Sequence, residues 1–513
     1  MIRIAYLSTL LPLALTQSWL SLPGSNYNPQ QPWGYSASTS WPRLGLGQQI
    51  TPQAPDAELE TMLAEIDPER IKAIVTTLAN FGTRHTLSNQ TNPVRGIGAA
   101  RDWIYRQMSS IANSSSGNMD VEIQSYIQGV VKGIYFPVKL SNVVARINGS
   151  SDANRTYVVT GHYDSRRIDI ADYTGDAPGA DDDATGVAGE FFTKLMFMAD
   201  WAVALEVARV CATRHPAATM IFAAVTGEEQ GLYGSKFLAE TLKNASINVE
   251  GHWDNDIVGT GTSQPFSPIN NYTVRLFGAS AAYPLSTSNH TEALDNLELL
   301  GEIGGQNDSP AQNLGRFIAE IVAGAAQYVN MQVALIYRAD RFLRGGDHES
   351  FLAAGFPAVR FTEAVEDFAH QHQDPRTQNG TVYSDLIEFV DFEYTARVAR
   401  VNLASMWSAA NAPGTPVNAS ISSLVGFPAA TESTPLLELS NESRFSWNTG
   451  NDPLVQGYEL IWRTSGTQQW TDSLYVGNVG TVTVNLPKDD LQFGIRAVGK
   501  DGRKSPAVYP LPT

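Results

Sequence analysis

The pattern of apolar positions changes along the chain from helical spacing to an alternation of strand-like and helical stretches. Apolar residues recur at helical spacing in "ELETMLAEIDPERIKAIVTTLANFG" and in "IGAARDWIYRQMSSIA". After them, apolar runs of strand length alternate with further helical patterns, as in "NVVARI", "TYVVTGHYDS", "ATMIFAAVTG" and "GSKFLAETLKN". This alternation predicts an α/β fold with a mostly parallel, open sheet that carries helices on both faces.

The C-terminal part of the chain has a different pattern. Proline and small residues in "NAPGTPVNAS" predict a linker over 411–420, so the α/β domain is expected over 55–410. Short strand-like runs without a helical pattern fill 421–513, which predicts a small all-β sandwich. Trp447, "GYELIW" and "FGIRAV" resemble a fibronectin type III domain, although Phe493 stands where a Tyr is common.

The N-terminus has the layout of a secretory signal peptide. "MIRIAYLSTLLPLALTQS" contains an early basic residue, Arg3, and an apolar run that is too short to cross a membrane. We therefore expect a signal peptide over 1–16 and secretion, with an ordinary apolar tail as the alternative. Residues 17–54 are rich in Pro, Gln, Ser and Tyr without periodicity, which predicts a disordered or propeptide-like lead-in. Asn-X-Ser/Thr sequons recur from Asn89 to Asn441, as expected of a secreted glycoprotein.

One stretch interrupts the α/β pattern. "GEFFTKLMFMADWA", residues 189–202, separates "GVA" from "VALEVARVCA", and without it the flanks would form one continuous amphipathic helix. Two interpretations stay open: a retained intron, and a genuine longer helix or hairpin.

Composition and charge narrow the function classes. The 513 residues are 43% hydrophobic and 17% charged, which is a globular composition. A formal net charge of −17 argues against nucleic acid and anionic membranes as partners, and no other apolar run reaches the length of a membrane span. The single cysteine, Cys211, excludes an internal disulfide framework and is expected to be a buried thiol.

Residue types that bind metals recur at the predicted ends of strands. In an open α/β sheet, sites form outside the carboxyl ends of the strands, so these side chains are expected to converge. Two histidines and three carboxylates suit a pair of Zn²⁺ ions, and without metal so many buried carboxylates would be costly. Each motif alone has an ordinary explanation, because a run of acids also suits a solvated loop or a helix N-terminus. The candidates are His162, Asp164, Asp181, Asp182, Asp183, Glu228, Glu229, Asp256, His370, His372 and Asp374.

Five motifs in order carry a resemblance to a known family. The M28 family of zinc peptidases is resembled by "GHYDS", "GADDDATG", "TGEEQGLYGS", "NDIVG" and "GDHESFLAAGFPA". The longer stretches "DAPGADDDATGVA" and "HQHQDPRT" look like those of its secreted fungal or bacterial members. The resemblance implies that His162 and Asp256 hold one zinc ion, that Glu229 and His370 hold the other, and that Asp182 bridges the two.

The resemblance also implies the catalytic roles. Glu228 would be the general base, which takes a proton from a metal-activated water and returns it to the leaving amine. Asp164 would orient His162, and a cis peptide bond would join Asp182 to Asp183. The "GGDHES" stretch matches a further family motif beside the ligands or toward the substrate.

The second histidine ligand is ambiguous. The family pattern of His followed four residues later by Asp selects His370 with Asp374 over His372. The family often has a Tyr directly before this histidine, where it could stabilise the oxyanion, but here that position is Ala369. No residue is assigned to that role.

The sequence therefore predicts a secreted exopeptidase with two Zn²⁺ ions, most simply an aminopeptidase that acts on peptides or proteins. One alternative is a glutaminyl-cyclase-like enzyme, which shares the fold and works with one zinc ion. Another is a binding protein that keeps the fold without catalysis. The ligand types do not distinguish aminopeptidase from carboxypeptidase action, and the oligomeric state is open.

Overall fold

The computed structural model describes residues 46–185, 202–261, 270–280, 298–422 and 442–513. The expected signal peptide over 1–16 lies outside the described residues, as do the first part of the lead-in and nearly all of 189–202. Among the described residues no helix has the length and apolar character needed to cross a membrane.

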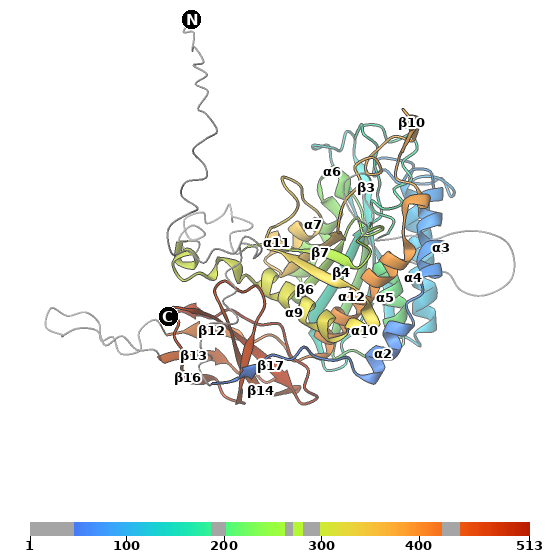
Figure 1. Cartoon of the computed structure of the whole chain (residues 1–513). Helices are drawn as coiled ribbons and strands as arrows, with labels where there is room; N and C mark the ends of the chain where they lie inside the picture. The colour runs from blue at the N-terminus through green and yellow to red at the C-terminus, as the bar shows by residue number, and fades with distance from the viewer. Residues whose placement is uncertain (1–45, 186–201, 262–269, 281–297, 423–441) are drawn as a thin grey trace, which may run out of the picture. The chain divides into compact units, whose positions relative to one another are not determined.

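An eight-stranded mixed sheet forms the centre of the α/β domain (Figure 1). Its strand order is β2-β3-β5-β4-β6-β9-β7-β8, with parallel pairing of β5, β4, β6 and β9 in the middle and of β7 with β8 at one edge. The other pairs, β2 with β3, β3 with β5 and β7 with β9, are antiparallel. The predicted fold class is thus confirmed. The strands are β2 (Met119–Gln128), β3 (Val138–Ile147), β4 (Asp152–His162), β5 (Ala218–Val225), β6 (Asn248–Asn255), β7 (Thr273–Gly278), β8 (Gln332–Ile336) and β9 (Ala358–Glu363).

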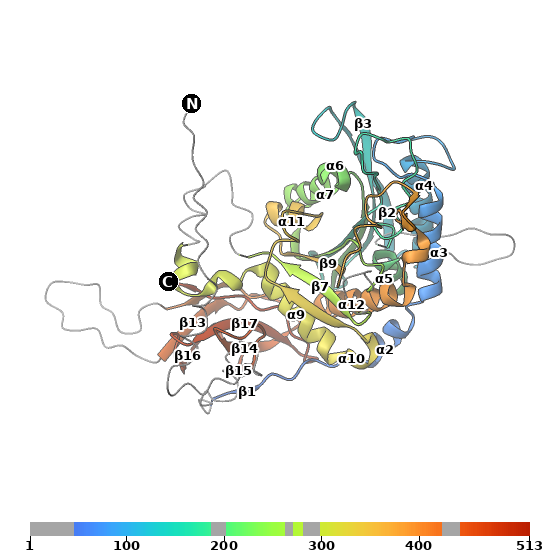
Figure 2. The same ribbon diagram turned by 45° about the horizontal axis from the view of Figure 1, so that its top comes forward.

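Helices cover both faces of this sheet because the central strands are apolar on both sides. Neighbouring residues of β4 show the alternation: Val159 packs into the core under one helical layer, and Val158 packs into the core under the other. Figures 1 and 2 show α3, α4, α5 and α12 on one face and α7 with α11 on the other. The helices of these layers are α2 (Ala57–Ala64), α3 (Pro68–Asn80), α4 (Ile97–Ser114), α5 (Val203–Cys211), α7 (Tyr233–Asn244), α9 (Pro310–Gly324), α10 (Ala326–Val329), α11 (His348–Ala354) and α12 (Phe392–Asn411).

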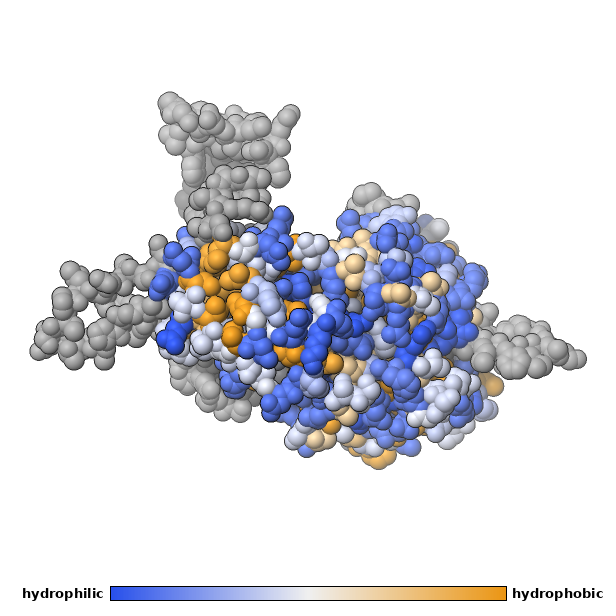
Figure 3. Space-filling model, turned by 90° about the horizontal axis from the view of Figure 1, so that it is seen from below, coloured by the Kyte–Doolittle hydropathy of each residue, from blue (hydrophilic) through white to orange (hydrophobic). Residues whose placement is uncertain are grey.

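The C-terminal part, together with β1 (Gln48–Gln49), forms two four-stranded sheets, in the orders β1-β15-β14-β17 and β16-β13-β12-β18. Their facing sides bury aromatic and aliphatic side chains, among them Trp447, Tyr458 and Phe493, so the predicted all-β sandwich is present. On the face seen in Figure 3, hydrophobic residues gather over this domain. The strands are β12 (Val417–Ile421), β13 (Glu442–Asn448), β14 (Val455–Thr464), β15 (Asp472–Gly477), β16 (Thr481–Asn485), β17 (Leu491–Gly499) and β18 (Leu511–Pro512).

The end of the predicted lead-in is an ordered part of the sandwich. Strand β1 (Gln48–Gln49) pairs antiparallel with β15, and Ile50 N donates to the Thr471 carbonyl at 2.9 Å. Ile50 also packs against the buried cluster of Ile461, Trp470 and Ala507. The lead-in therefore does not extend as a disordered segment to residue 54, because these residues add an edge strand and apolar contacts to the C-terminal domain.

A buried charge cluster joins the two domains. Asp308, just before α9, accepts Arg316 from that helix at 2.9 Å and Arg463 from β14 at 2.6 Å. Both guanidinium groups lie over the ring of Trp470, and Arg316 Nε donates to the Gln468 carbonyl at 2.8 Å. The cluster is almost fully buried and sets two guanidinium groups against one carboxylate, so removal of Asp308 would leave two uncompensated charges in the interface.

Candidate active site

Three neighbouring parallel strands place the candidate residues at one edge of the sheet. His162 is the last residue of β4, and Asp256 follows directly after β6. Glu228 and Glu229 open the short helix α6 (Glu228–Gly231) immediately after β5. Gly227 makes this turn possible, because its φ of 76° lies in the left-handed region that glycine adopts without strain. The predicted convergence at the carboxyl ends of the strands is found in the structure.

Asp182 lies between two histidines. Its Oδ1 is 3.3 Å from His162 Nε2, and its Oδ2 is 2.7 Å from His372 Nε2. On one side Asp256 Oδ2 lies 3.9 Å from His162 Nε2, and on the other Glu229 Oε2 lies 3.2 Å from His372 Nε2. Two groups of three potential ligands therefore share one carboxylate, which is the geometry expected of a bridge between two ions.

Several ligand atoms of this cluster are buried without a hydrogen-bond partner among the described residues. They are His162 Nε2, Glu229 Oε1 and Asp256 Oδ1. Buried polar atoms are normally satisfied, and orphaned ones cost free energy. The nitrogen and carboxylate oxygen donors are those that Zn²⁺ prefers, so the residues present fit two zinc ions.

The histidine of the second group is His372, which corrects the prediction of His370. The imidazole of His370 stacks on Phe389 with 3.6 Å between ring centroids, and its Nδ1 lies 3.7 Å from Asp367. His372 instead adopts a positive φ of 52°, and its Nε2 reaches Asp182 and Glu229. His370 was predicted from its spacing to Asp374, and this criterion was wrong. Asp374 pairs with Arg167 at 2.9 Å.

The correction also changes the position at which a tyrosine was sought. The residue directly before the ligand is Gln371, and Ala369 is two positions further back. The Gln371 side chain accepts from Arg344 at 3.2 Å and donates to Glu366 at 3.1 Å. Its amide is therefore held by neighbouring charged groups.

Asp164 ties His162 to the start of α6. His162 Nδ1 lies 3.1 Å from the backbone carbonyl of Asp164 and 3.7 Å from its Oδ1, so the ring is oriented mainly by the carbonyl. The buried carboxylate accepts the backbone N–H groups of Gly227 at 2.9 Å, of Glu228 at 3.3 Å and of Glu229 at 3.3 Å. One aspartate thereby positions a ligand strand and the two adjacent glutamates together.

Three further residues hold the site residues in place, and no sequence motif marks them. Asp385 accepts the backbone N–H groups of Asp181 and Asp182, each at 2.7 Å, and so holds the bridging loop, whose Asp182–Asp183 peptide bond is cis as predicted. Thr86 donates to Asp164 at 2.9 Å. Arg360 Nη2 lies 2.9 Å from Asp256 Oδ2.

Burial and neighbouring charges shift the pKa values across the site. Burial lowers the pKa of His372, but the carboxylates of Glu229 and Asp182 outweigh it and raise that pKa to about 10. Burial raises the pKa of Asp182, but His372 and His162 hold it well below its usual range. The pKa of Glu228 is raised well above its usual range, mainly by burial. In the metal-free protein, His372 is thus a cation between two ligand carboxylates.

The "GGDHES" stretch lies near the ligand cluster, since the charges of Asp347 and His162 interact. Asp347 is buried, and burial followed by the charge of Asp254 raises its pKa well above the usual range. The backbone N–H of His348 donates to Asp254 Oδ2 at 3.1 Å, and its Nε2 lies 2.8 Å from the Ala339 carbonyl. His348 is therefore held by the fold next to the site and is not among the candidate ligand groups.

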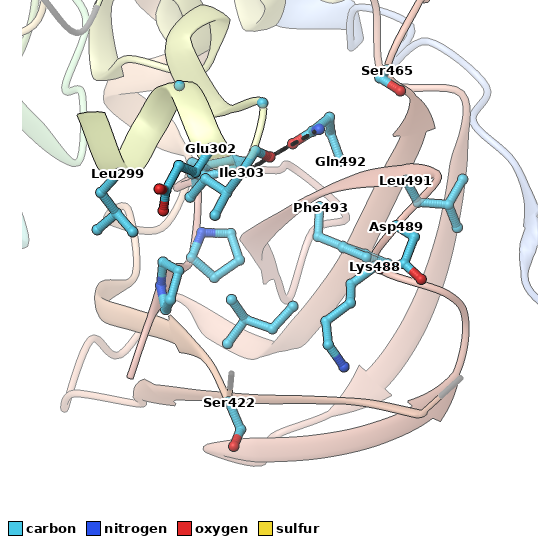
Figure 4. A pocket seen from close by; sticks show the side chains of 16 residues that line it. Leu299, Glu302, Ile303, Ser422, Ser465, Lys488, Asp489, Leu491, Gln492 and Phe493 are labelled. Carbon is cyan, nitrogen blue, oxygen red and sulfur yellow. Dashed lines mark hydrogen bonds between the residues drawn. The ribbon is translucent and has the colours of Figure 1, made fainter. Parts of the chain in front are cut away.

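The cluster opens into a cleft of about 540 Å³ that is lined by Glu228 together with Asp182, Glu229, Asp256 and His372. A larger cavity of about 680 Å³ lies elsewhere, against the C-terminal domain (Figure 4). There Gln492 donates to the Ile303 carbonyl at 3.3 Å, and none of the lining residues belongs to a candidate metal group. The chemistry of the site belongs to the smaller cleft.

Comparison with known sequences identifies close relatives. Residues 142–387 match the family model "Peptidase family M28". A "Probable zinc metalloprotease" of Pyrenophora tritici-repentis is 51% identical over 476 residues, which cover 93% of this chain and 91% of the relative. A protein of the same name in Pyricularia oryzae is 50% identical and covers 93% of this chain and 89% of the relative.

Solved structures are more distant. LapB from Legionella pneumophila has a TM-score of 0.45 at 19% identity, covering 70% of this chain and 77% of that chain. An aminopeptidase from Aneurinibacillus sp. strain AM-1 has a TM-score of 0.45 at 15% identity and covers 70% of this chain and 97% of that chain. Similarities of this size do not bear on the reaction.

Proposed function

The chain belongs to peptidase family M28 and is a zinc metallopeptidase, and from that premise we propose that it is a secreted exopeptidase with two zinc ions, of aminopeptidase type. The observation that carries the proposal is the position of Asp182, whose two carboxylate oxygens face different histidines at 3.3 and 2.7 Å. A single-zinc site would not need this shared carboxylate.

The five donors divide into two groups around that carboxylate. His162 and Asp256 would hold one zinc ion, Glu229 and His372 the other, and Asp182 both. When bound, two zinc ions supply a water of lowered pKa and polarise the scissile carbonyl.

Glu228 moves the proton in this scheme. It lines the cleft beside the ligands, and no metal group includes it, so its carboxylate is free for proton transfer. It accepts a proton from the attacking water and donates it to the leaving amine nitrogen. Asp164 accepts the backbone N–H groups of both Glu228 and Glu229 and so fixes the positions from which the two side chains extend. The buried strand β5 leads into the turn that carries both glutamates.

Aminopeptidase action, secretion and glycosylation are supported by the sequence. The five ordered motifs resemble family M28, the longer stretches "DAPGADDDATGVA" and "HQHQDPRT" resemble its secreted members, and residues 1–16 have the composition of a signal peptide. Sequons such as Asn89 and Asn441 would then be available for glycosylation. The C-terminal sandwich is proposed to be fibronectin type III-like, on the strength of Trp447 and the "GYELIW" strand.

The experiment that tests the function combines metal analysis with a peptide digest. The purified, zinc-loaded chain is dialysed, its zinc content is measured, and a peptide library is digested and followed by mass spectrometry. We expect two zinc ions per chain and stepwise loss of N-terminal residues. One zinc ion together with cyclisation of N-terminal glutamine would favour the glutaminyl-cyclase alternative. Zinc binding without any peptide cleavage would favour a binding protein. Trimming from the C-terminus would retain the peptidase and overturn the aminopeptidase assignment.

A further inference from the structure

The cleft is positively charged outside its metal groups. Four cationic residues line it, namely Lys132, Arg166, Arg341 and Arg344. The acidic residues of the described lining are Asp182, Glu228, Glu229 and Asp256, all of which belong to the metal groups or act as the base. This concentration of positive charge stands in a chain whose formal net charge is −17.

The cations come from three separate loops. Lys132 lies between β2 and β3, Arg166 follows β4, and Arg344 lies between β8 and α11. Because these loops are far apart in the sequence, the fold alone brings them to one cleft. Such convergence of like charges costs free energy unless an anion offsets it.

Two carboxylates near the cleft, Glu366 and Asp340, are each shared by more than one arginine. Glu366 alone receives Arg275 at 2.6 Å, Arg341 at 3.0 Å and Arg344 at 3.0 Å. Asp340 is already engaged by Arg341 and by Arg360, at 2.8 Å each. Arg344 is held in place by Glu366 and Gln371, and its side chain remains 31% exposed in the cleft.

The two cations from the other loops, Arg166 and Lys132, have even less compensation. In the part of the chain that the structure describes, Arg166 forms one ion pair, with Glu229 at 3.7 Å, and that carboxylate is a candidate zinc ligand. Lys132 is exposed at the rim and forms no ion pair among the described residues. Three of the four acidic residues in the lining would bind zinc, and the fourth, Glu228, would act as the base. The positive charge of the lysine and arginines in the cleft would then exceed the negative charge left to balance it.

We propose that this cleft recognises a carboxylate of the substrate, placed within a residue or two of the scissile bond, through Lys132, Arg166 and Arg344. The inference rests on the proposed function and names the substrate class. The carboxylate has two possible sources, an acidic side chain or the free C-terminus of a short peptide. Charge-assisted hydrogen bonds of guanidinium and ammonium groups to a carboxylate supply the recognition.

The test compares peptides that differ only in charge. Three pairs are used with the zinc-loaded full chain: Asp-Ala-Ala-amide against Asn-Ala-Ala-amide, Leu-Glu-Ala-amide against Leu-Gln-Ala-amide, and Leu-Ala against Leu-Ala-amide. The first two pairs report an acidic side chain on either side of the bond, and the third reports a free C-terminus. We expect kcat/KM of the charged member to exceed that of its neutral partner by about tenfold to a hundredfold in at least one pair, the range of a hydrogen bond to a charged group.

Variants assign the preference to the cleft. Lys132→Met, Arg166→Met and Arg344→Met are each expected to reduce the charged-to-neutral ratio, whereas Lys139→Met, an exposed lysine on β3 outside the cleft, is the matched control. Binding of the same pairs to Glu228→Gln, measured by calorimetry at low and high salt, gives a readout without turnover, and the preference is expected to weaken as salt screens the charges.

Two results overturn the inference. One is a ratio within about threefold in all three pairs, which is below the range of a charged hydrogen bond. The other is a large ratio that survives all three cleft variants. If neither member of any pair is cleaved although zinc is bound, the proposed function fails instead, and the binding comparison in Glu228→Gln still decides the carboxylate site.

Discussion

His372 and His370 provide a matched pair of substitutions, because they are two residues apart and only one faces the metal cluster. His372→Ala removes a donor that lies 2.7 Å from Asp182 and 3.2 Å from Glu229. Loss of a supporting residue around a metal ligand typically costs tenfold to a hundredfold in metal affinity, so loss of a ligand itself is expected to cost at least about a hundredfold, or about 3 kcal/mol. His370→Ala removes a ring stacked on Phe389, which is expected to lower the free energy of unfolding by about 0.5–1.5 kcal/mol without changing the zinc content.

Zinc content after dialysis against a weak chelator, together with kcat/KM on a fixed peptide, separates the two variants. We expect His372→Ala to retain about one zinc ion per chain and to lose most activity. We expect His370→Ala to retain two, with a lower Tm and near-normal kcat/KM. Loss of zinc from His370→Ala, with two ions retained by His372→Ala, would refute the reasoning from the structure and restore the assignment made on sequence spacing.

Three further outcomes follow from the same geometry. Asp182→Asn is expected to weaken both zinc ions together, since its two oxygens face both histidines, and equilibrium dialysis that showed loss of only one ion would contradict a bridge. Zinc binding at pH 7.5 is expected to release a proton from His372, because its pKa in the metal-free protein is raised to about 10. The apparent zinc affinity of that site should therefore fall about tenfold for each pH unit below this value. Calorimetry in buffers of different ionisation enthalpy measures the proton release, and a zinc affinity that does not change between pH 6 and 9 would contradict it. Asp308→Asn leaves the buried Arg316 and Arg463 without their shared carboxylate at the domain interface and is expected to cost about 3–5 kcal/mol, whereas Asp120→Asn at an exposed position of β2 should cost little; equal unfolding midpoints in urea would show that the cluster does not join the domains.

The sequence was sufficient to predict the position of the site residues that lie directly at strand ends. His162, Asp256 and the two glutamates follow apolar runs that could only be buried strands, and parallel neighbours deliver such positions to one edge. The α/β class and the all-β character of the C-terminal domain follow from the change in hydrophobic period in the same way.

The sequence was insufficient where a loop decides the direction of a side chain. His370 and His372 lie in the same irregular segment, and the left-handed backbone at His372, with the stacking of His370 on Phe389, selects the ligand. Asp385 and Arg360 act through contacts with residues far away in the sequence, and no local motif marks them. The role of Gln48 and Gln49 was missed for a similar reason, because an edge strand of two residues has no periodicity to detect.

The most direct test of the central claim compares the zinc content and the kcat of Glu228→Gln with those of the unmodified chain. Glu228 lies in the cleft outside both metal groups, so the amide should leave two zinc ions bound and remove only proton transfer. We expect two ions per chain and a fall in kcat of about a hundredfold to ten-thousandfold. Unchanged kcat with two zinc ions bound would contradict the account.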